Sequence, residues 1–322
     1  MASIEYRSLG SSGLRVSTIG LGCNNFGRDH TATKTQDGTN AVIDAAIEAG
    51  VTLFDTADIY GAERGLSETL MGNALGSRRN EIVLATKFGM DMQGANGPDW
   101  GARGSRRYVR LAVEASLRRL QTDWIDLYQL HVPDPLTPIE ETLAVLDDLI
   151  TEGKVRYIGH SNLSGWQIAD AEYVATLAGH PRFVSAQNEY SLLARGVEAE
   201  VLPAVNAYGL GFLPFFPLYN GLFTGKFSRE GGPQGSRIMT IRKHLLDNAP
   251  WDAMEQYAAF CDERGITMLE ATFGWLLAQP RLTSVTAGAT SPEQIRQNAD
   301  AATAWVPTGD DAERISALFP VV

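Results

Sequence analysis

Short apolar segments alternate with longer amphipathic segments along this chain, and the alternation predicts its fold class. Segments of strand character lie near residues 16–22, 51–55, 82–87, 125–131, 155–159, 183–188, 211–216 and 283–288. Strands that alternate with helices form parallel sheets. Eight such repeats favour a closed α/β barrel, the (β/α)8 or TIM barrel, over an open sheet. Residues 4–8 and 14–17 flank a Gly/Ser turn and predict an N-terminal β-hairpin in front of it.

The amphipathic segments predict the helices that surround such a barrel. We expect helices over 40–49, 67–75, 105–120, 137–151, 164–177, 194–208 and 291–302. Thr137 and Pro138 suit a cap and a first helical position, and Ser291 to Gln294 resembles a capping box. Extra helices are expected over 251–264 and 269–278, before the eighth strand, and over 310–318 at the C-terminus. Residues 226–250 are interpreted as a long loop, and 1–322 as a single domain without an internal linker.

Composition narrows the classes of protein and partner. The 322 residues, 44% hydrophobic and 20% charged, suit one barrel with a large core. The net charge of −11 argues against nucleic acid or an anionic membrane as the main partner. Cys23 and Cys261 are expected to be reduced thiols of a cytoplasmic protein. The first residues lack the pattern of a signal peptide, and no stretch approaches the roughly 20 apolar residues that span a bilayer.

Several familiar sequence motifs are missing. The chain has no G-x-G-x-x-G dinucleotide fingerprint and no H-E-x-x-H metal motif. Residues 221–226 resemble a phosphate-binding loop but are one residue short, and Phe227 stands where Ser or Thr is required. The five histidines lack metal-ligand spacing, so we expect no metal site.

Three consecutive predicted strands end in residues that carry chemistry. Asp55 ends the strand near 51–55, Lys87 ends the next, and His131 ends the one after. Tyr60 follows Asp55 by five residues. The C-terminal ends of barrel strands converge on one face, where barrel enzymes hold their catalytic groups, so these four side chains are expected to meet there.

The surrounding motifs resemble those of the aldo-keto reductase family along nearly the whole chain. They include 54–61 (FDTADIYG), 85–87 (ATK), 116–131 (SLRRLQTDWIDLYQLH), 158–162 (IGHSN), 187–192 (QNEYSL) and 224–226 (TGK). Their joint order resembles the bacterial, potassium-channel-β-like branch. The resemblance implies an NAD(P)H-dependent oxidoreductase that reduces aldehydes or ketones.

The chemistry of carbonyl reduction agrees with these four residues. Hydride must come from a cofactor, while a proton donor must reach the carbonyl oxygen. Tyr60 is the candidate donor, and a charged Lys87 would lower the pKa of its phenol. Asp55 would keep Lys87 charged, and His131 would orient the carbonyl. The alternative is a merely structural buried Lys–Asp pair. Asp58 is set aside as the catalytic acid in favour of Asp55.

The resemblance also assigns cofactor contacts by position. Ser161, Asn162 and Gln187 would hold the carboxamide, Phe215 would stack on the nicotinamide, and Phe216 replaces a more usual Ser. The expected set is Gly22, Cys23, Asn24, Asp55, Ser161, Asn162, Gln187, Phe215, Phe216, Pro217, Leu218, Lys226, Arg237, Gly288, Thr290, Gln294, Gln297 and Asn298. Gly288 and Gln294 stand where some relatives carry Lys and Arg for a 2′-phosphate. Resemblance to the branch of the family that carries Gln here still implies NADP(H) as the cofactor, with NAD(H) as an alternative.

The expected substrate is a small carbonyl compound or sugar. Tyr60, His131, Phe26 and Trp100 are expected to contact it, with the Gly-rich loop 88–104 as one wall of an open pocket. Two alternatives stay open: a sugar or polyol dehydrogenase that runs in the oxidative direction, and a slow cofactor-sensing binding subunit. A monomer or weak homo-oligomer is expected.

Overall fold

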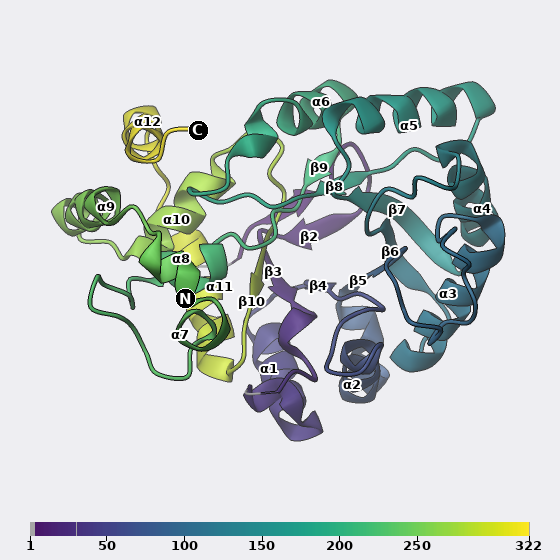
Figure 1. Cartoon of the computed structure of the whole chain (residues 1–322), viewed down its shortest axis with the longest axis horizontal. Coiled ribbons are helices and arrows are strands. Elements are labelled where there is room, and N and C mark those ends of the chain that lie inside the picture. The colour runs from purple at the N-terminus through teal and green to yellow at the C-terminus, as the bar shows by residue number, and fades with distance from the viewer. Residues whose placement is uncertain (1–3, 30, 322) are drawn as a thin grey trace.

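Eight parallel strands follow chain order around a barrel (Figure 1). The computed structural model describes residues 4–29 and 31–321. The strands are β3 (Ile19–Gly22), β4 (Leu53–Asp55), β5 (Val83–Phe88), β6 (Ile125–Leu130), β7 (Val155–Ser161), β8 (Ser185–Gln187), β9 (Gly211–Phe212) and β10 (Val285–Gly288). β10 pairs with β3, and a parallel bridge between Phe212 and Leu282 joins β9 to the segment before β10. The predicted TIM-barrel class is confirmed.

The predicted hairpin is formed by the antiparallel strands β1 (Tyr6–Ser8) and β2 (Arg15–Ser17), and it covers the N-terminal end of the barrel. Leu9 and Val16 are buried with a small inner cluster of strand residues that includes Leu53 and Leu127. The turn requires glycine at position 10, because φ is +59° and a Cβ would lie 2.5 Å from the nitrogen of Gly211. The hairpin therefore closes the bottom, which leaves the C-terminal face for chemistry.

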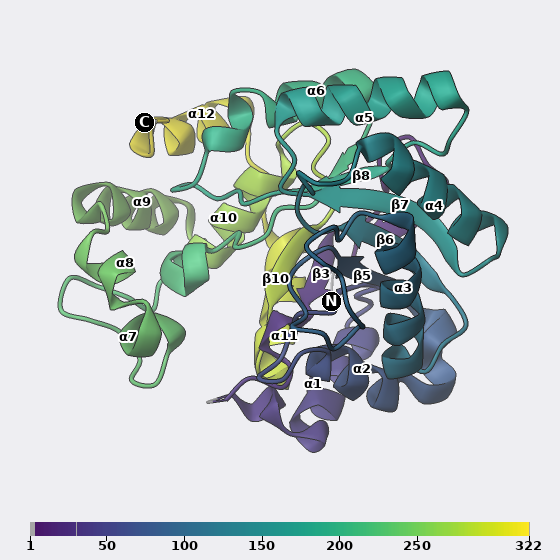
Figure 2. The same cartoon turned by 45° about the vertical axis from the view of Figure 1, so that its right-hand side comes forward.

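Helices pack around the strands and bury a second, larger core between the two layers. They are α1 (Gln36–Glu48), α2 (Leu66–Leu75), α3 (Arg106–Leu120), α4 (Ile139–Thr151), α5 (Gly165–Ala178), α6 (Val201–Tyr208), α10 (Met268–Leu277) and α11 (Pro292–Ala304). Neighbours in the chain contact one another from α1 to α6, and α11 contacts both α10 and α1. Figure 2 shows this layer from a second direction.

Additional helices lie on one side of the barrel. Figures 1 and 2 show α7 (Arg237–Ile241), α8 (Lys243–Asp247), α9 (Trp251–Arg264) and α12 (Gly309–Leu318) outside the β/α repeat. α9, α10 and α12 match the extra helices expected before the eighth strand and at the C-terminus. The prediction of a long loop over 226–250 was wrong, because α7 and α8 lie within this segment. Ser236 stabilises the start of α7, since its side chain accepts a hydrogen bond from the Met239 amide.

Helix starts are the other places where prediction and structure differ. The helix expected over 194–208 begins at Val201, because Pro203 fits only in a first turn. Thr137 does not cap α4: its hydroxyl donates to Asp134 instead, and Pro138 occupies the N-cap position. At α11, Ser291 caps the helix as expected, but the Gln294 side chain accepts from Thr290, so the capping box is incomplete.

Candidate active site

A buried ion pair lies at the C-terminal ends of β4 and β5. Asp55 is the last residue of β4, and Lys87 is the penultimate residue of β5. Lys87 Nζ lies 2.7 Å from Asp55 Oδ2 and donates a second hydrogen bond to the Thr56 carbonyl at 2.8 Å. Burial disfavours the ammonium, but Asp55 and Tyr60 outweigh this, so the pKa of Lys87 is raised. Lys87 therefore stays charged although its side chain is fully buried.

Two glutamine amides complete the surroundings of Asp55. Gln129 and Gln187 each donate from Nε2 to Asp55 Oδ1 at 3.1 Å. Gln129 was not among the predicted site residues, although it precedes His131 by two positions and so faces the same side of β6. Gln187 was expected to hold a cofactor carboxamide, yet its amide nitrogen is engaged with Asp55. These two amides fix the position of the carboxylate beside Lys87.

Tyr60 lies between Lys87 and His131. Lys87 Nζ is 5.1 Å from the centre of the tyrosine ring, and the His131 ring meets it edge-on with centroids 5.8 Å apart. Burial raises the pKa of Tyr60, and Lys87 lowers it only in part. We expected a net lowering by Lys87; the net shift is upward because burial is the larger effect. Tyr60 is thus a protonated phenol at neutral pH.

His131 follows β6 directly and is neutral. Burial, and then the charge of Lys87, lower its pKa to about 3. Its Nδ1 is buried without a hydrogen-bond partner. A neutral imidazole with a free nitrogen at this position suits a hydrogen bond to a small polar group beside Tyr60.

Asp58 points away from these groups. It is fully buried and accepts a hydrogen bond from Asn96 Nδ2 at 2.8 Å. Asn96 in turn accepts from Arg119, which also forms an ion pair with Glu68 at 2.7 Å. Burial, and then the charge of Glu68, raise the pKa of Asp58 well above its usual range. Asp58 therefore belongs to a polar network that anchors the loop after β5, a connection that sequence analysis did not anticipate.

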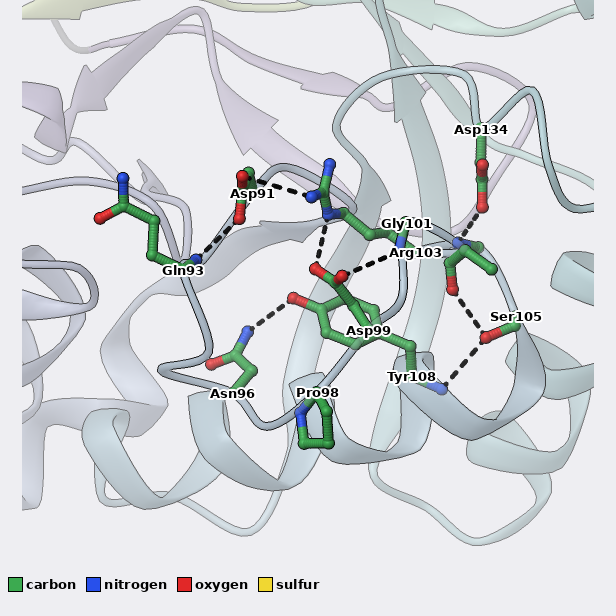
Figure 3. Close-up of polar contacts among 12 residues, drawn as sticks. Asp91, Gln93, Asn96, Pro98, Asp99, Gly101, Arg103, Ser105, Tyr108 and Asp134 are labelled. Carbon is green, nitrogen blue, oxygen red and sulfur yellow. Dashed lines mark hydrogen bonds and ion pairs between the residues drawn. The ribbon is translucent and has the colours of Figure 1, made fainter.

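The loop after β5 is cross-linked by its own polar residues (Figure 3). Arg103 pairs with Asp91 and Asp99, and Asn96 donates to the Tyr108 hydroxyl at 3.4 Å. Trp100, expected to contact substrate, is 76% exposed, with the Arg107 guanidinium 4.3 Å from its ring centre. Trp100 stays a predicted substrate contact.

Phe26 differs from its expected place. Its side chain is fully buried in the large core between strands and helices, so it has no surface to offer a substrate. The apolar residues around Phe26 in the sequence are compatible with either a substrate pocket or the core, and only the packing of the folded chain shows that the side chain lies in the core. Cys23 is likewise fully buried; its thiol contacts the Leu21 carbonyl at 3.4 Å, and burial raises its pKa well above the usual range.

Other expected cofactor contacts line the C-terminal strand ends. Gly22 ends β3 directly opposite Gly288, which ends β10. Ser161 ends β7, where Asn162 Nδ2 donates to its hydroxyl at 3.0 Å and to the His131 carbonyl at 2.9 Å. The remaining residues of this rim follow β9: Phe215 and Phe216, whose rings meet edge-on, then Pro217 and Leu218.

The expected phosphate and adenosine residues follow β9 and β10. Lys226 is exposed, whereas Arg237 is half-buried at the start of α7, with its guanidinium 5.6 Å from the Phe216 ring centre. Gln294 accepts from the Thr290 amide and hydroxyl, so these two expected residues bond each other. On α11, Asn298 is buried and Gln297 exposed, while Arg296 forms an ion pair with Glu48 at 3.1 Å and is turned away.

The residues present fit a nicotinamide dinucleotide. Near the C-terminal strand ends, Asn24 Oδ1, Asn188 Oδ1, Asn220 Oδ1 and Arg237 Nε are buried without hydrogen-bond partners. Amide oxygens and a guanidinium nitrogen match the donors and phosphates of such a cofactor. Within 4–29 and 31–321, no cluster of His, Cys, Asp or Glu is suited to a metal ion. None of the helices in the same described part of the chain is long and apolar enough to cross a membrane.

Comparison with known proteins agrees with this architecture. Residues 18–319 match the model of the Aldo/keto reductase family. The chain is similar to an uncharacterized oxidoreductase, YrpG, of Bacillus subtilis, with 39% identity over 91% of this chain and 89% of that protein. It is 36% identical to a probable aldo-keto reductase 1 of Glycine max, over 92% and 84% of the two chains.

A third relative carries a different description. A probable voltage-gated potassium channel subunit beta of Oryza sativa subsp. japonica is 34% identical, over 92% of this chain and 90% of the relative. The family match and these relatives together span nearly the whole sequence. The chain therefore belongs to the aldo/keto reductase family and is an NAD(P)H-dependent oxidoreductase.

Proposed function

We propose that the protein reduces aldehyde or ketone groups with NADPH, and that Tyr60 gives the proton to the carbonyl oxygen. The observation that carries the proposal is the buried Lys87–Asp55 pair, 2.7 Å apart, with the Tyr60 ring beside the ammonium. When bound, the reduced nicotinamide supplies hydride to the carbonyl carbon. The chain's own task is then to hold the carbonyl and deliver one proton.

The four side chains divide that task. Tyr60 starts as a protonated phenol, which is the form a proton donor needs. Lys87, kept charged by Asp55, stabilises the phenolate left after transfer. His131 is neutral, and its Nδ1 is buried without a hydrogen-bond partner. In the tautomer whose hydrogen lies on the nitrogen that faces the carbonyl, His131 donates a hydrogen bond to the carbonyl oxygen and so orients the substrate.

The cofactor residues divide by chemistry. Ser161 and Asn162 at the end of β7 suit the carboxamide, and Phe215 offers an aromatic face for stacking. Arg237 and Lys226 suit the phosphates. We infer NADP(H) rather than NAD(H) from the family resemblance of the segment at the start of α11. Titration of protein fluorescence with NADPH and NADH tests this, and equal affinities would refute it.

The Tyr60→Phe variant tests the proton donor. We expect unchanged NADPH binding, because the ring remains, and a loss of carbonyl reduction of about 100-fold to 10,000-fold, the usual worth of general acid catalysis. Near-normal turnover would overturn the assignment. A wild-type protein that binds NADPH tightly but turns over slowly on aldehydes, ketones and sugars would instead favour a slow cofactor-sensing binding subunit; the rice relative is described as a probable voltage-gated potassium channel subunit beta.

A further inference from the structure

A tight turn after β4 places Tyr60 beside Lys87. The Tyr60 amide donates to the Ala57 carbonyl at 3.1 Å, so Asp58 and Ile59 are the central residues of this turn. The Asp58 amide donates to the Lys87 carbonyl at 3.2 Å, which joins the turn to β5 through the backbone. The position of Tyr60 therefore depends on how Asp58 is held.

The Asp58 side chain joins the same turn to the loop after β5. Asp58 and Asn96 are both buried, and Asp58 Oδ2 accepts a hydrogen bond from Asn96 Nδ2 at 2.8 Å. Within the described ranges, 4–29 and 31–321, no other side chain donates to Asp58, and its Oδ1 is buried without a partner. A buried acceptor that loses its donor is unfavourable, so loss of Asn96 would leave Asp58 free to move towards other partners.

Asn96 is itself held in one orientation by α3. Arg119 Nη1 donates to Asn96 Oδ1 at 3.0 Å, and Asn96 Nδ2 also donates to the Tyr108 hydroxyl at 3.4 Å (Figure 3). Arg119 Nε donates to Glu68 Oε2 at 2.7 Å, while Glu68 Oε1 accepts from Thr86 of β5 at 2.6 Å. The amide of Asn96 thus connects the turn to α2, α3 and β5.

We propose that Asn96 is a positioning residue for proton transfer: through Asp58 it holds the turn that presents the Tyr60 hydroxyl to the carbonyl oxygen. The proposal rests on the proposed role of Tyr60 and adds a residue outside the four side chains assigned to catalysis. Proton transfer requires hydrogen-bond distance between donor and acceptor. A displacement of about 1 Å can therefore cost about 100-fold in rate.

The variant Asn96→Leu removes both hydrogen-bonding groups and keeps a side chain of similar size. We expect kcat for an aldehyde to fall about 10-fold to 100-fold, while KM and the Kd of NADPH stay within about twofold. Asn73→Leu is the matched control. Asn73 lies on α2 and also bonds two polar side chains, Gln36 and Gln121, but it is exposed, so kcat should stay at the wild-type value.

A rescue variant tests the hydrogen bond itself. When Asp58→Asn is combined with Asn96→Asp, the amide at position 58 can donate to the carboxylate at position 96, which still faces Arg119. We expect kcat to return to within about fivefold of wild type, since a hydrogen bond between the two positions is restored. Three results would overturn the proposal: wild-type kcat in Asn96→Leu with only thermal stability lowered, an equal loss of kcat in Asn73→Leu, or a rescue variant as slow as Asn96→Leu.

Hydrogen exchange gives a readout that needs no turnover. The Tyr60 amide is protected by its bond to Ala57, and it should exchange about 10-fold faster in Asn96→Leu but at the wild-type rate in Asn73→Leu. Unchanged exchange at Tyr60 in Asn96→Leu would also contradict the proposal. If Tyr60→Phe reduces aldehydes at a normal rate, the proposed proton donor fails, whereas faster exchange in Asn96→Leu still supports the attachment of the turn through Asn96.

Discussion

Removal of the charge on Asp55 is expected to make stability depend on pH in a way that reveals the state of Lys87. In Asp55→Asn, the amide can still accept from Gln129 or Gln187 but no longer balances the ammonium. Lys87 is fully buried, and its pKa is raised only because Asp55 and Tyr60 outweigh burial. Without Asp55, burial dominates and the folded-state pKa of Lys87 falls below its unfolded value of about 10.4.

The sign of the effect follows from proton binding. A folded state that holds Lys87 less protonated than the unfolded state gains stability as pH rises from the folded to the unfolded pKa. Breaking a buried pair from one side costs about 3–5 kcal/mol, a large share of the roughly 5–15 kcal/mol that stabilises a typical protein. The loss of stability should therefore be greatest near pH 6. Between pH 6 and pH 10 it should shrink by about 1.4 kcal/mol for each unit by which the folded-state pKa of Lys87 lies below its unfolded value.

Urea unfolding of wild type and Asp55→Asn at several pH values between 6 and 10 measures this directly. Asp126→Asn is the matched control: Asp126 forms an equally short buried pair, 2.8 Å from Arg79, near the start of β6. Arginine stays protonated throughout this range, so the control should lose stability by a constant amount. A pH-independent loss in Asp55→Asn, or the same recovery in the control, would show that Lys87 does not depend on Asp55 for its charge.

Two further predictions follow from burial. Since the pKa of His131 is about 3, kcat/KM for a neutral aldehyde should show no ionisation of His131 between pH 5 and 8; a step near pH 6.5 that disappears in His131→Gln would contradict this. The thiols should be unreactive, because burial raises the pKa of Cys261 to about 12 and that of Cys23 well above its usual range. Iodoacetamide at pH 8 should label neither thiol until urea unfolds the chain, and rapid labelling of the native protein would refute their burial.

The strand ends of the barrel could be predicted from the sequence because their signal is local. A short apolar run that ends in Asp55, Lys87 or His131 carries both the strand and the position of the polar side chain. Element starts were less predictable where two local signals compete. Thr137 is suited to cap a helix, yet its hydroxyl donates to Asp134 instead. Pro203 fits only in the first turn of α6, so the helix begins at Val201, seven residues after the start that the apolar pattern predicts.

The contacts that could not be predicted join loops far apart in the chain. Asn96 donates a hydrogen bond to Asp58 across 38 residues, and Asn162 donates one to the His131 carbonyl across 31. No periodicity encodes such contacts, since they depend on how the loops after β4, β5, β6 and β7 fold over the same face. Phe26 illustrates the converse: its pattern suits a pocket, but the packing of that loop turns it into the core.

The protonation state of Tyr60 follows from the balance between burial and charge around it. Burial holds its pKa above the ordinary value, so the phenol is protonated at neutral pH and suited to give a proton in reduction. Oxidation of an alcohol requires the phenolate, which Lys87 favours. As pH rises towards the pKa of Tyr60, the rate of carbonyl reduction should therefore fall and the rate of alcohol oxidation should rise. The same ion pair of Lys87 and Asp55 thus serves both half-reactions, because it stabilises the phenolate that reduction produces and oxidation consumes.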